Sequence, residues 1–346
     1  MQVVSVIGAG SWGTALAILL ARKGVKCLLW ARDSNFARQL QEKRENTRYL
    51  AGFPLPDSLC ITSSLKDAVC EANVLLMVVP SHGMRDVLNA VSGILRSSGR
   101  EKAIDAVVSA SKGIENTTLL TMTQVMEQTL PVSLHGSLAA LSGPSFAKEV
   151  AQGLPTAVTI AAANLELAVE LQRLFSAENM RCYASADLMG VQLAGALKNV
   201  IAIAAGICDG MGLGDNARAA LITRGLAEIA RLGVKLGANP MTFAGLAGLG
   251  DLVLTCTGAL SRNRYVGLEL GRGLKLQEII TNMDMVAEGV KTCASAWDLA
   301  RLHQVSMPIT EQVYRVLYED RDSRTVVREL LTRPLAQEFD VHLSEQ

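Results

Sequence analysis

Three glycines near the start of the chain have the spacing that binding of a dinucleotide requires. Gly8, Gly10 and Gly13 form a GxGxxG pattern between the apolar run 3–7 and a helical run at 14–22. The first glycine permits a tight turn, the second lets backbone approach a pyrophosphate, and the third lets helix pack on strand. The helix N-terminus then offers free N–H groups to the phosphate oxygens. Such turns are common alone, but this strand–loop–helix context favours dinucleotide binding.

The end of the next apolar run bears on which dinucleotide binds. An acidic residue about 20 residues past the loop normally holds the ribose hydroxyls of NAD, whereas an arginine accommodates the 2′-phosphate of NADP. Here Arg32 comes first and Asp33 follows. We expect Arg32 to face a 2′-phosphate or to stack on adenine, with Asp33 on the ribose or in solvent. The pattern predicts use of NAD or NADP, with NADPH somewhat favoured.

A single lysine stands in the middle of a long apolar segment. Residues 188–208 carry Lys198 as their only charge, beside Asn199 and among three glycines. The length fits a membrane helix, but a charge at mid-span is costly in lipid, so a helix buried in a globular domain is the better interpretation. Lys198 could reach the surface, pair with a carboxylate, or act as a catalytic group whose pKa has been lowered by burial and a neighbouring cation. Lys112, after an apolar run, could be that cation.

Two further polar groups could complete a site. Ser261, Arg262, Asn263 and Arg264 stand at a predicted helix start, where a hydroxyl, a guanidinium and an amide suit a phosphate dianion. The alternative is a capped surface helix with solvated arginines. Asp251 follows a glycine-rich connection at 245–250. It could orient Lys198, bind a substrate hydroxyl, or only cap a helix.

The elements that must position these residues fall into two sets. Apolar strand-like runs separated by helices predict a parallel sheet covered on both faces; they lie at 3–7, 25–30, 73–79, 106–110, 138–141, 156–161 and 181–183. From about residue 186 helical runs dominate, at 187–208, 217–236, 264–272, 286–303 and 309–319. We therefore predict an α/β Rossmann-type domain over residues 1–185 and an all-α domain over residues 186–346. Ligands of such sheets bind beyond the carboxyl ends of the strands, where Lys112 would lie.

The composition excludes several classes of protein. The 346 residues include 33 basic and 33 acidic ones, so no general field attracts nucleic acid or an anionic membrane, and phosphate recognition must be local. Seven cysteines form no CxxC pair and have no metal-ligand spacing to the four histidines. We expect a cytoplasmic protein without a metal site, without membrane insertion and without a nucleic-acid partner.

Several motifs together make the chain similar to a known family. The segments are Gly8–Thr14, Ser111–Gly113, Leu141–Ala147, Gly195–Asn199, Gly250–Cys256 and Ser261–Arg264. In this order they resemble the bacterial-type NAD(P)-dependent glycerol-3-phosphate dehydrogenases, over essentially the whole chain. The resemblance implies a helical second domain like that of 6-phosphogluconate dehydrogenase, which closes over the substrate.

The resemblance also implies roles for individual residues. The dinucleotide would be contacted by Gly8, Gly10, Ser11, Trp12, Gly13, Arg32, Lys112, Ala147, Arg262, Val286 and Glu288. The substrate would be contacted by Lys112, Gly143, Ser145, Lys198, Asp251, Ser261, Arg262 and Asn263. Lys198 would be the proton acceptor, and Lys112 and Asp251 would complete the catalytic group.

The expected reaction reduces dihydroxyacetone phosphate to sn-glycerol 3-phosphate. Lys198 and Lys112 would polarise the ketone, and Lys198 would give its proton to the forming alkoxide. By resemblance the product supplies glycerophospholipid synthesis, and the enzyme is expected to be a homodimer. The rivals are a ketopantoate-type reductase, which recognises a carboxylate in place of a phosphate, and a dinucleotide-sensing protein without catalysis.

Overall fold

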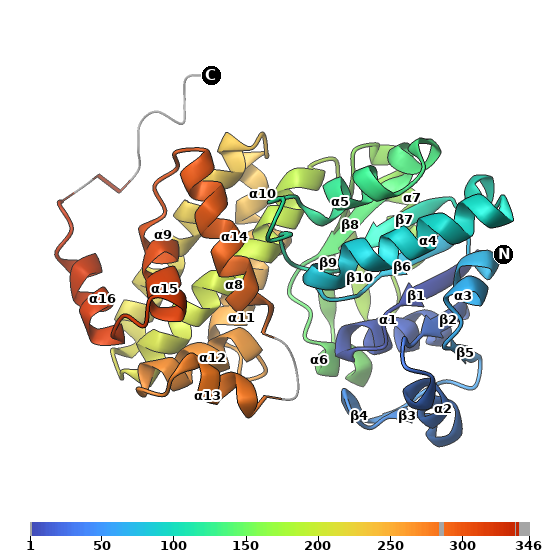
Figure 1. Cartoon of the computed structure of the whole chain (residues 1–346), viewed down its shortest axis with the longest axis horizontal. Coiled ribbons are helices and arrows are strands. Elements are labelled where there is room, and N and C mark those ends of the chain that lie inside the picture. Colours follow the sequence, from blue (N-terminus) through green and yellow to red (C-terminus); the bar gives the residue numbers. More distant parts are fainter. Residues whose placement is uncertain (1, 284–286, 336, 339–346) are drawn as a thin grey trace.

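The computed structural model describes residues 2–283, 287–335 and 337–338. An α/β part and an all-helical part lie side by side, with the N-terminal sheet at one end and the C-terminal helices at the other (Figure 1). The last sheet strand ends at Ser185, and the next element is a helix that begins at Leu188. We call residues 3–185 the sheet half and residues 188–331 the helical half.

The sheet half is built on eight strands in the order β10-β9-β8-β7-β6-β1-β2-β5. Their bounds are β1 Val3–Ile7, β2 Lys26–Trp30, β5 Leu59–Thr62, β6 Val74–Met77, β7 Ala106–Ser109, β8 Leu138–Ser142, β9 Thr156–Ala162 and β10 Met180–Ser185. The pairs from β5 to β8 are parallel, as predicted. The prediction of a wholly parallel sheet is wrong in one place, because β8 and β9 run antiparallel.

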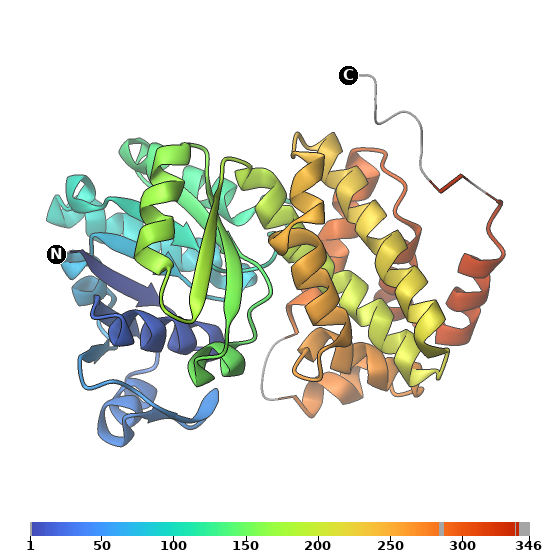
Figure 2. The same ribbon diagram turned by 180° about the vertical axis from the view of Figure 1, so that it is seen from behind.

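Helices cover both faces of the sheet. Neighbouring residues on β6 belong to different hydrophobic cores. Leu76 packs with helix residues on one face of the sheet, and Leu75 and Met77 pack on the other face. The first face carries α1 Ser11–Arg22, α2 Ser34–Lys43, α6 Ala147–Gln152 and α7 Leu165–Phe175. The second carries α3 Leu65–Glu71, α4 Met84–Ser98 and α5 Met122–Thr129. Figures 1 and 2 show the two faces in turn. Burial on both faces explains why the strands are apolar without alternation.

Three strands were not predicted from the sequence. The hairpin of β3 Glu45–Asn46 and β4 Leu50–Pro54 forms a separate two-stranded sheet. Strand β5 lies at the edge of the main sheet, where alternate residues are exposed. Short or half-exposed strands carry too few apolar residues to stand out from loops.

The helical half is arranged around α8 Leu188–Gly210. The surrounding helices are α9 Gly214–Lys235, α10 Pro240–Ala244, α11 Asp251–Thr257, α12 Arg262–Gly271, α13 Leu276–Thr281, α14 Glu288–Leu302, α15 Pro308–Tyr318 and α16 Ser323–Leu331. The connection at 245–250 was predicted to interrupt the helices, but Leu246–Gly250 forms a π-helical turn that leads directly into α11. Of the predicted helix 286–303, residue 286 lies outside the described residues and Ala287 is the N-cap of α14.

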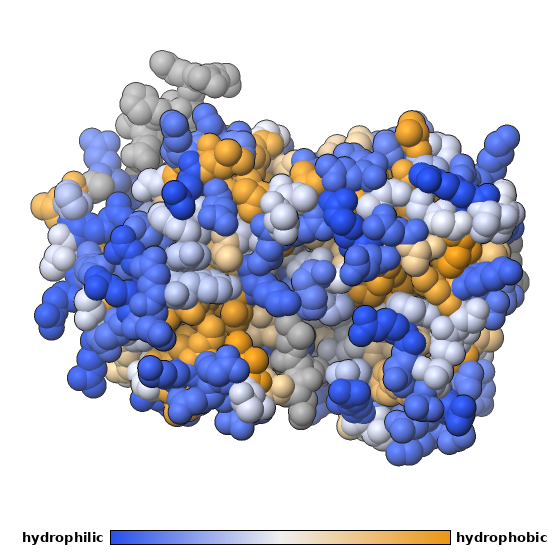
Figure 3. Space-filling view, viewed as in Figure 1, coloured by the Kyte–Doolittle hydropathy of each residue, from blue (hydrophilic) through white to orange (hydrophobic). Residues whose placement is uncertain are grey.

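Helix α8 has the length and composition of a membrane span, and it is the one such helix in the described part of the chain. Its most apolar window is completely buried by the rest of the protein. The surface in Figure 3 mixes polar residues with several separate apolar patches. As predicted, α8 is therefore the core helix of a globular unit.

Four glycines bring α8 and α12 into backbone contact. A Cβ on Gly206 would collide with the carbonyl oxygen of Arg264, and one on Gly267 with that of Ile203. One turn further along, Gly210 and Gly271 meet in the same way, so that a Cβ on Gly271 would lie 3.0 Å from the Cα of Gly210. This close crossing fixes the N-terminus of α12 relative to the middle of α8.

Candidate functional site

The glycine loop has the geometry that the GxGxxG pattern predicts. Gly8 has a φ of +127°, and a Cβ there would lie 2.6 Å from the carbonyl oxygen of Val78. A Cβ on Gly13 would collide with the carbonyl oxygen of Gly8, so the close packing of α1 on the strand requires glycine. A Cβ on Gly10 would meet no atom within 4 Å. Gly10 therefore faces open space, which suits the approach of a pyrophosphate.

The N-terminus of α1 is available to an anion. Gly10 is the N-cap residue and has no side chain that could accept from the N–H groups of the first turn, where Ser11 and Trp12 stand. The indole Nε1 of Trp12 is buried without a hydrogen-bond partner among the described residues. A buried asparagine supports the loop from behind: the amide of Asn46 donates to the Ala9 carbonyl at 3.0 Å and to the Thr14 hydroxyl at 2.7 Å. These residues fit a dinucleotide phosphate.

Arg32 and Asp33 differ in their engagement. The Asp33 carboxylate caps α2 by accepting from the backbone N–H of Phe36 at 2.7 Å. Arg32 is exposed at the end of the β2 segment. The acidic residue thus has a structural task, whereas the guanidinium is accessible to a phosphate.

At the centre of the molecule one carboxylate joins two lysines that come from different halves. Asp251, the first residue of α11, lies 2.8 Å through Oδ1 from the Nζ of Lys198 and 2.6 Å through Oδ2 from the Nζ of Lys112. Asp251 is 1% exposed and Lys198 is 6% exposed. Asp251 is thus the carboxylate that compensates the buried charge of Lys198, and Lys112 is the second cation bound to that carboxylate.

The Lys198 ammonium has a second oxygen partner in Thr255. Its Nζ donates to the Thr255 hydroxyl at 2.6 Å, and that hydroxyl donates to the Asp251 backbone carbonyl at 2.6 Å. Burial lowers the pKa of Lys198 to about 8, with Lys112 contributing to the lowering and Asp251 opposing it. A lysine with a pKa of about 8 can exchange protons with a substrate near neutral pH.

The loop after β8 completes the surroundings of Lys112. The Gly143 carbonyl accepts from the Lys112 Nζ at 2.9 Å and from the Ser145 hydroxyl at 2.9 Å. Gly143 has a φ of +142°, and a Cβ there would lie 2.9 Å from the Cα of Val158, so the turn needs glycine. Ala147 begins α6, which packs against α1 behind the glycine loop.

The N-terminus of α12 is joined to α8 beside Lys198. Ser261 caps α12 by accepting from the Arg264 N–H at 3.2 Å. The Asn263 amide donates to the Asn199 Oδ1 at 2.9 Å. Arg262 is solvent-exposed as a residue. Neighbouring protein atoms nevertheless displace water around its guanidinium and so lower the pKa of that group, while the Glu288 carboxylate opposes this effect. Arg264 instead binds Asp209 at 2.7 Å and so has a structural role.

Glu288 reaches from the start of α14 back to the sheet half. Its carboxylate accepts from the Ser81 hydroxyl at 2.6 Å and from the Ser81 N–H at 3.2 Å. Ser81 follows β6, so this contact lies at the same edge of the sheet as Lys112. Val286, which the sequence analysis placed near the dinucleotide, lies outside the described residues.

The structure therefore gathers most of the predicted residues into two groups, and the start of α12 with the start of α14 forms a third. Lys112, Lys198, Asp251, Gly143 and Ser145 form the centre, and the glycine loop with Arg32 lies along the β1–β2 side of the sheet. Sequence reasoning missed Thr255, Asn46 and Ser81. The spacing of Thr255, four residues after Asp251 on a helix, was a usable signal because such residues share a face.

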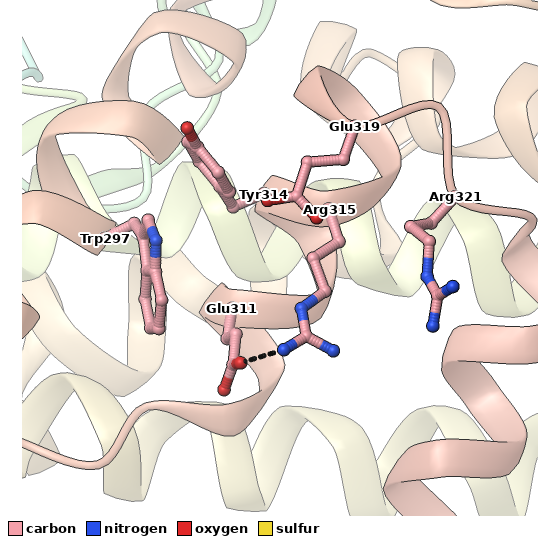
Figure 4. Close-up of a pocket in the computed structure, with 6 residues that line it drawn as sticks. All are labelled: Trp297, Glu311, Tyr314, Arg315, Glu319 and Arg321. Carbon is pink, nitrogen blue, oxygen red and sulfur yellow. Dashed lines mark hydrogen bonds and ion pairs between the residues drawn. The ribbon is translucent and has the colours of Figure 1, made fainter.

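A separate cavity of about 300 Å³ lies on α14 and α15. It is lined by Trp297, Glu311, Tyr314, Arg315, Glu319 and Arg321 (Figure 4). Arg315 is paired with Glu311 at 2.6 Å and with Glu329 at 3.3 Å, so its charge is already neutralised. None of the residues predicted to bind ligands lines this cavity. Within the described residues no cluster of histidine, cysteine or acidic side chains could hold a metal ion.

Comparison with known proteins adds a family to this geometry. Models described as the N-terminus and the C-terminus of NAD-dependent glycerol-3-phosphate dehydrogenase match residues 3–168 and 187–328. A glycerol-3-phosphate dehydrogenase [NAD(P)+] from Geobacter metallireducens is 56% identical over 330 residues, covering 95% of this chain and 97% of the relative.

Solved structures agree with this match. Glycerol-3-phosphate dehydrogenase from Coxiella burnetii, whose crystal structure is known, is 40% identical to this chain in sequence and has a TM-score of 0.88. The match covers 96% of this chain and 99% of the Coxiella chain. A ketopantoate reductase from Ralstonia eutropha is 14% identical with a TM-score of 0.57, covering 96% of this chain and 100% of its own. This second likeness shows the fold alone.

Proposed function

Because the chain belongs to the NAD-dependent glycerol-3-phosphate dehydrogenase family, we propose that it interconverts dihydroxyacetone phosphate and sn-glycerol 3-phosphate with NAD or NADP. The observation that carries the proposal is the buried arrangement in which Asp251 binds both Lys198 and Lys112. The Lys198 side chain is 7% exposed and the Lys112 side chain 17% exposed, and the single carboxylate of Asp251 leaves this pair with one net positive charge that an anionic ligand can offset.

The substrate is proposed to lie between the two lysines and the start of α12. Arg262, Asn263 and Ser261 supply a guanidinium, an amide and a helix N-terminus for the phosphate group. Gly143 and Ser145 lie beside Lys112 and would border the three-carbon chain. The ketone oxygen would face the Nζ atoms of Lys198 and Lys112.

Lys198 is proposed to carry the proton. In the reducing direction its ammonium donates to the oxygen on carbon 2 as negative charge develops there, and Lys112 stabilises that charge. In the oxidising direction the neutral amine of Lys198 accepts the hydroxyl proton. Asp251 and Thr255 hold the Nζ in place through bonds of 2.8 and 2.6 Å. The nicotinamide, when bound, supplies or accepts the hydride at carbon 2.

The glycine loop, α1 and Arg32 are proposed to hold the dinucleotide. Open space at Gly10 and the uncapped first turn of α1 fit its pyrophosphate. The engaged carboxylate of Asp33 and the exposed Arg32 favour NADPH. Ser11, Trp12, Gly13, Ala147, Arg262 and Glu288 are proposed to line the rest of its path.

Five broader expectations stay predictions. We propose that residues 1–185 form the dinucleotide-binding domain and that residues 186–346 complete the substrate site. We also propose a cytoplasmic homodimer whose product supplies glycerophospholipid synthesis.

The test is oxidation of NADH and NADPH by the purified protein with dihydroxyacetone phosphate, followed by absorbance. We expect turnover with both dinucleotides and none with ketopantoate, since that substrate carries a carboxylate in place of the phosphate. Turnover with ketopantoate alone would overturn the assignment. The cofactor preference is tested with Arg32→Ala, which should raise the KM for NADPH and leave that for NADH nearly unchanged.

A further inference from the structure

A series of hydrogen bonds, here called the circuit, leads from Ser81, a residue that the proposed reaction does not use, to the backbone carbonyl of Lys112. Ser81, 3% exposed, follows β6 and donates to both oxygens of Glu288, through its hydroxyl at 2.6 Å and its N–H at 3.2 Å. The contact joins the sheet half to the first residue of α14.

From α14 the circuit passes through two asparagines. The Gly289 N–H donates to the Asn263 Oδ1 at 2.9 Å, and the Asn263 amide donates to the Asn199 Oδ1 at 2.9 Å. The Asn199 amide donates to the Lys112 carbonyl at 3.3 Å. Since Lys112 follows β7, which pairs with β6, the circuit ends one strand away from where it began.

Two glycines make room for this circuit. A Cβ on Gly113 would lie 2.5 Å from the Ser81 Cβ and 3.3 Å from a Glu288 oxygen. A Cβ on Gly289 would lie 2.7 Å from the Asn199 carbonyl and 2.7 Å from the Asn263 Oδ1. Close contacts thus confine the circuit beside Ser81 and at Gly289, which leaves Glu288 and Asn263 little freedom as long as the Ser81 bonds persist.

We propose that Ser81 is a positioning residue that sets Glu288 for the dinucleotide and, through Gly289, sets the amide of Asn263 for the substrate phosphate. The inference rests on the proposed function, because the two ligands are those of the proposed reaction. Ser81 itself would contact neither ligand.

The circuit leaves out the group that moves the proton. The bonds from Lys198 to Asp251 and Thr255 belong to α8 and α11 and do not pass through Ser81 or Glu288. Loss of the Ser81 hydroxyl removes a hydrogen bond to a charged group, and the freed Glu288 carboxylate can turn toward Arg262, whose charge already acts on it. Binding of both ligands should therefore weaken, while the chemical step continues at its normal rate.

The test compares Ser81→Ala with the wild type. We expect the KM for dihydroxyacetone phosphate and the Kd for NADPH, measured by nucleotide fluorescence, to rise about tenfold, the usual effect of a lost hydrogen bond to a charge. The kcat and its dependence on pH should stay unchanged. In a Glu288→Ala background, which removes the acceptor, Ser81→Ala should add no further loss, because Ser81 acts through that side chain.

Ser295→Ala is the matched control. Ser295 is also a buried serine that joins the halves, donating to the Asn116 side chain at 3.0 Å outside the circuit. It should affect thermal unfolding but neither ligand constant. If Ser81→Ala does not fold, Ser81→Cys, with a weak donor of similar size, should give the same pattern.

Several outcomes would overturn the inference: ligand constants equal to those of the wild type, a loss confined to kcat, or losses that add in the double variant. A wild type without turnover would refute the proposed function instead, and the NADPH titration would still test the Ser81 contact.

Discussion

At the scale of single residues, the main feature is a carboxylate that serves two cations. Asp251 binds Lys112 from the sheet half and Lys198 from the helical half. The buried ammonium of Lys198 is thereby compensated, yet burial keeps its pKa low enough for proton exchange.

Replacing the charge of Lys198 tests its role directly. Lys198→Met keeps the apolar stem of the side chain and removes the ammonium group with its proton. Turnover should fall by about 10²–10⁴, the usual contribution of a general acid or base, with the Kd for NADPH unchanged. Lys291→Met, at an exposed lysine on α14, is the control and should behave as the wild type. Near-normal turnover of Lys198→Met would remove this residue from the mechanism.

The pH dependence should differ in sign between the two directions. With a pKa of about 8, Lys198 is protonated below that pH and neutral above it. Reduction of dihydroxyacetone phosphate needs the proton, so its kcat/KM should fall as pH rises through about 8. Oxidation of sn-glycerol 3-phosphate needs the neutral amine, so its kcat/KM should rise through the same range. Profiles that move together would contradict the role given to Lys198.

The sequence was informative about residues whose type is unusual for their surroundings. Lys198 stood out because a charge in an apolar segment needs a reason, and the glycines of the loop stood out by their spacing. Ser81 and Asn46 gave no such signal, because serine and asparagine are common in loops and their partners lie 207 and 32 positions away. Hydrogen-bond partners that lie far apart in the sequence can be identified for such common residues only once the fold is known.

At the scale of elements, the crossing of α8 and α12 sets the geometry of the site. The backbones touch at Gly206 and Gly267, and the same two helices carry Lys198 and Arg262. Because these two positions are glycines, the helices can approach closely, and this approach sets the distance between Lys198 and the proposed phosphate site at Arg262.

Gly267→Ala should separate these helices. The added Cβ meets backbone atoms of α8, which cannot turn aside, so we expect a loss of stability of about 1–3 kcal/mol. The KM for dihydroxyacetone phosphate should rise as the start of α12 moves away from Lys198. Thermal unfolding and initial rates measure the two effects. Gly93→Ala in α4 is the control: its Cβ meets nothing within 4 Å, so this variant should be at least as stable as the wild type. Equal behaviour of the two variants would mean that the glycine contact does not set the helix distance.

Element prediction succeeded for the strands buried on both faces and for the edge strand β10, and failed at the opposite edge of the sheet. The runs 3–7 and 106–110 correspond to β1 and β7 within one residue. The direction of β9 was wrong because its apolar run says nothing about orientation, and the short α6 between β8 and β9 is compatible with either direction. The edge strand β5 was missed because it is half exposed.

At the scale of the whole molecule, a buried carboxyl should make stability depend on pH. Glu228 on α9, 2% exposed, accepts from the N–H groups of Ile309 at 2.6 Å and Thr310 at 3.2 Å at the start of α15. Burial raises its pKa from 4.5 to about 7, against the effect of these bonds. Between these values the folded state keeps a proton that the unfolded state has lost, so stability falls as pH rises.

Glu228→Gln should remove this dependence. Relative to the variant, the wild type should lose on the order of 3 kcal/mol between pH 4.5 and 7. Denaturant unfolding of both proteins at a series of pH values measures it, since other titrating groups cancel in the difference. Parallel curves would mean that Glu228 ionises normally.

The shared carboxylate also has a consequence for how a ligand arrives. Lys112, Lys198 and Arg262 bring three positive charges to a region where Asp251 and Glu288 supply two negative ones, whereas the chain as a whole has a net charge of +0. A small excess of positive potential therefore remains within a neutral molecule, and dissolved ions screen it over about 8 Å at physiological ionic strength. Added salt should lower the association rate of a doubly charged phosphate ester and should not change that of an uncharged triose.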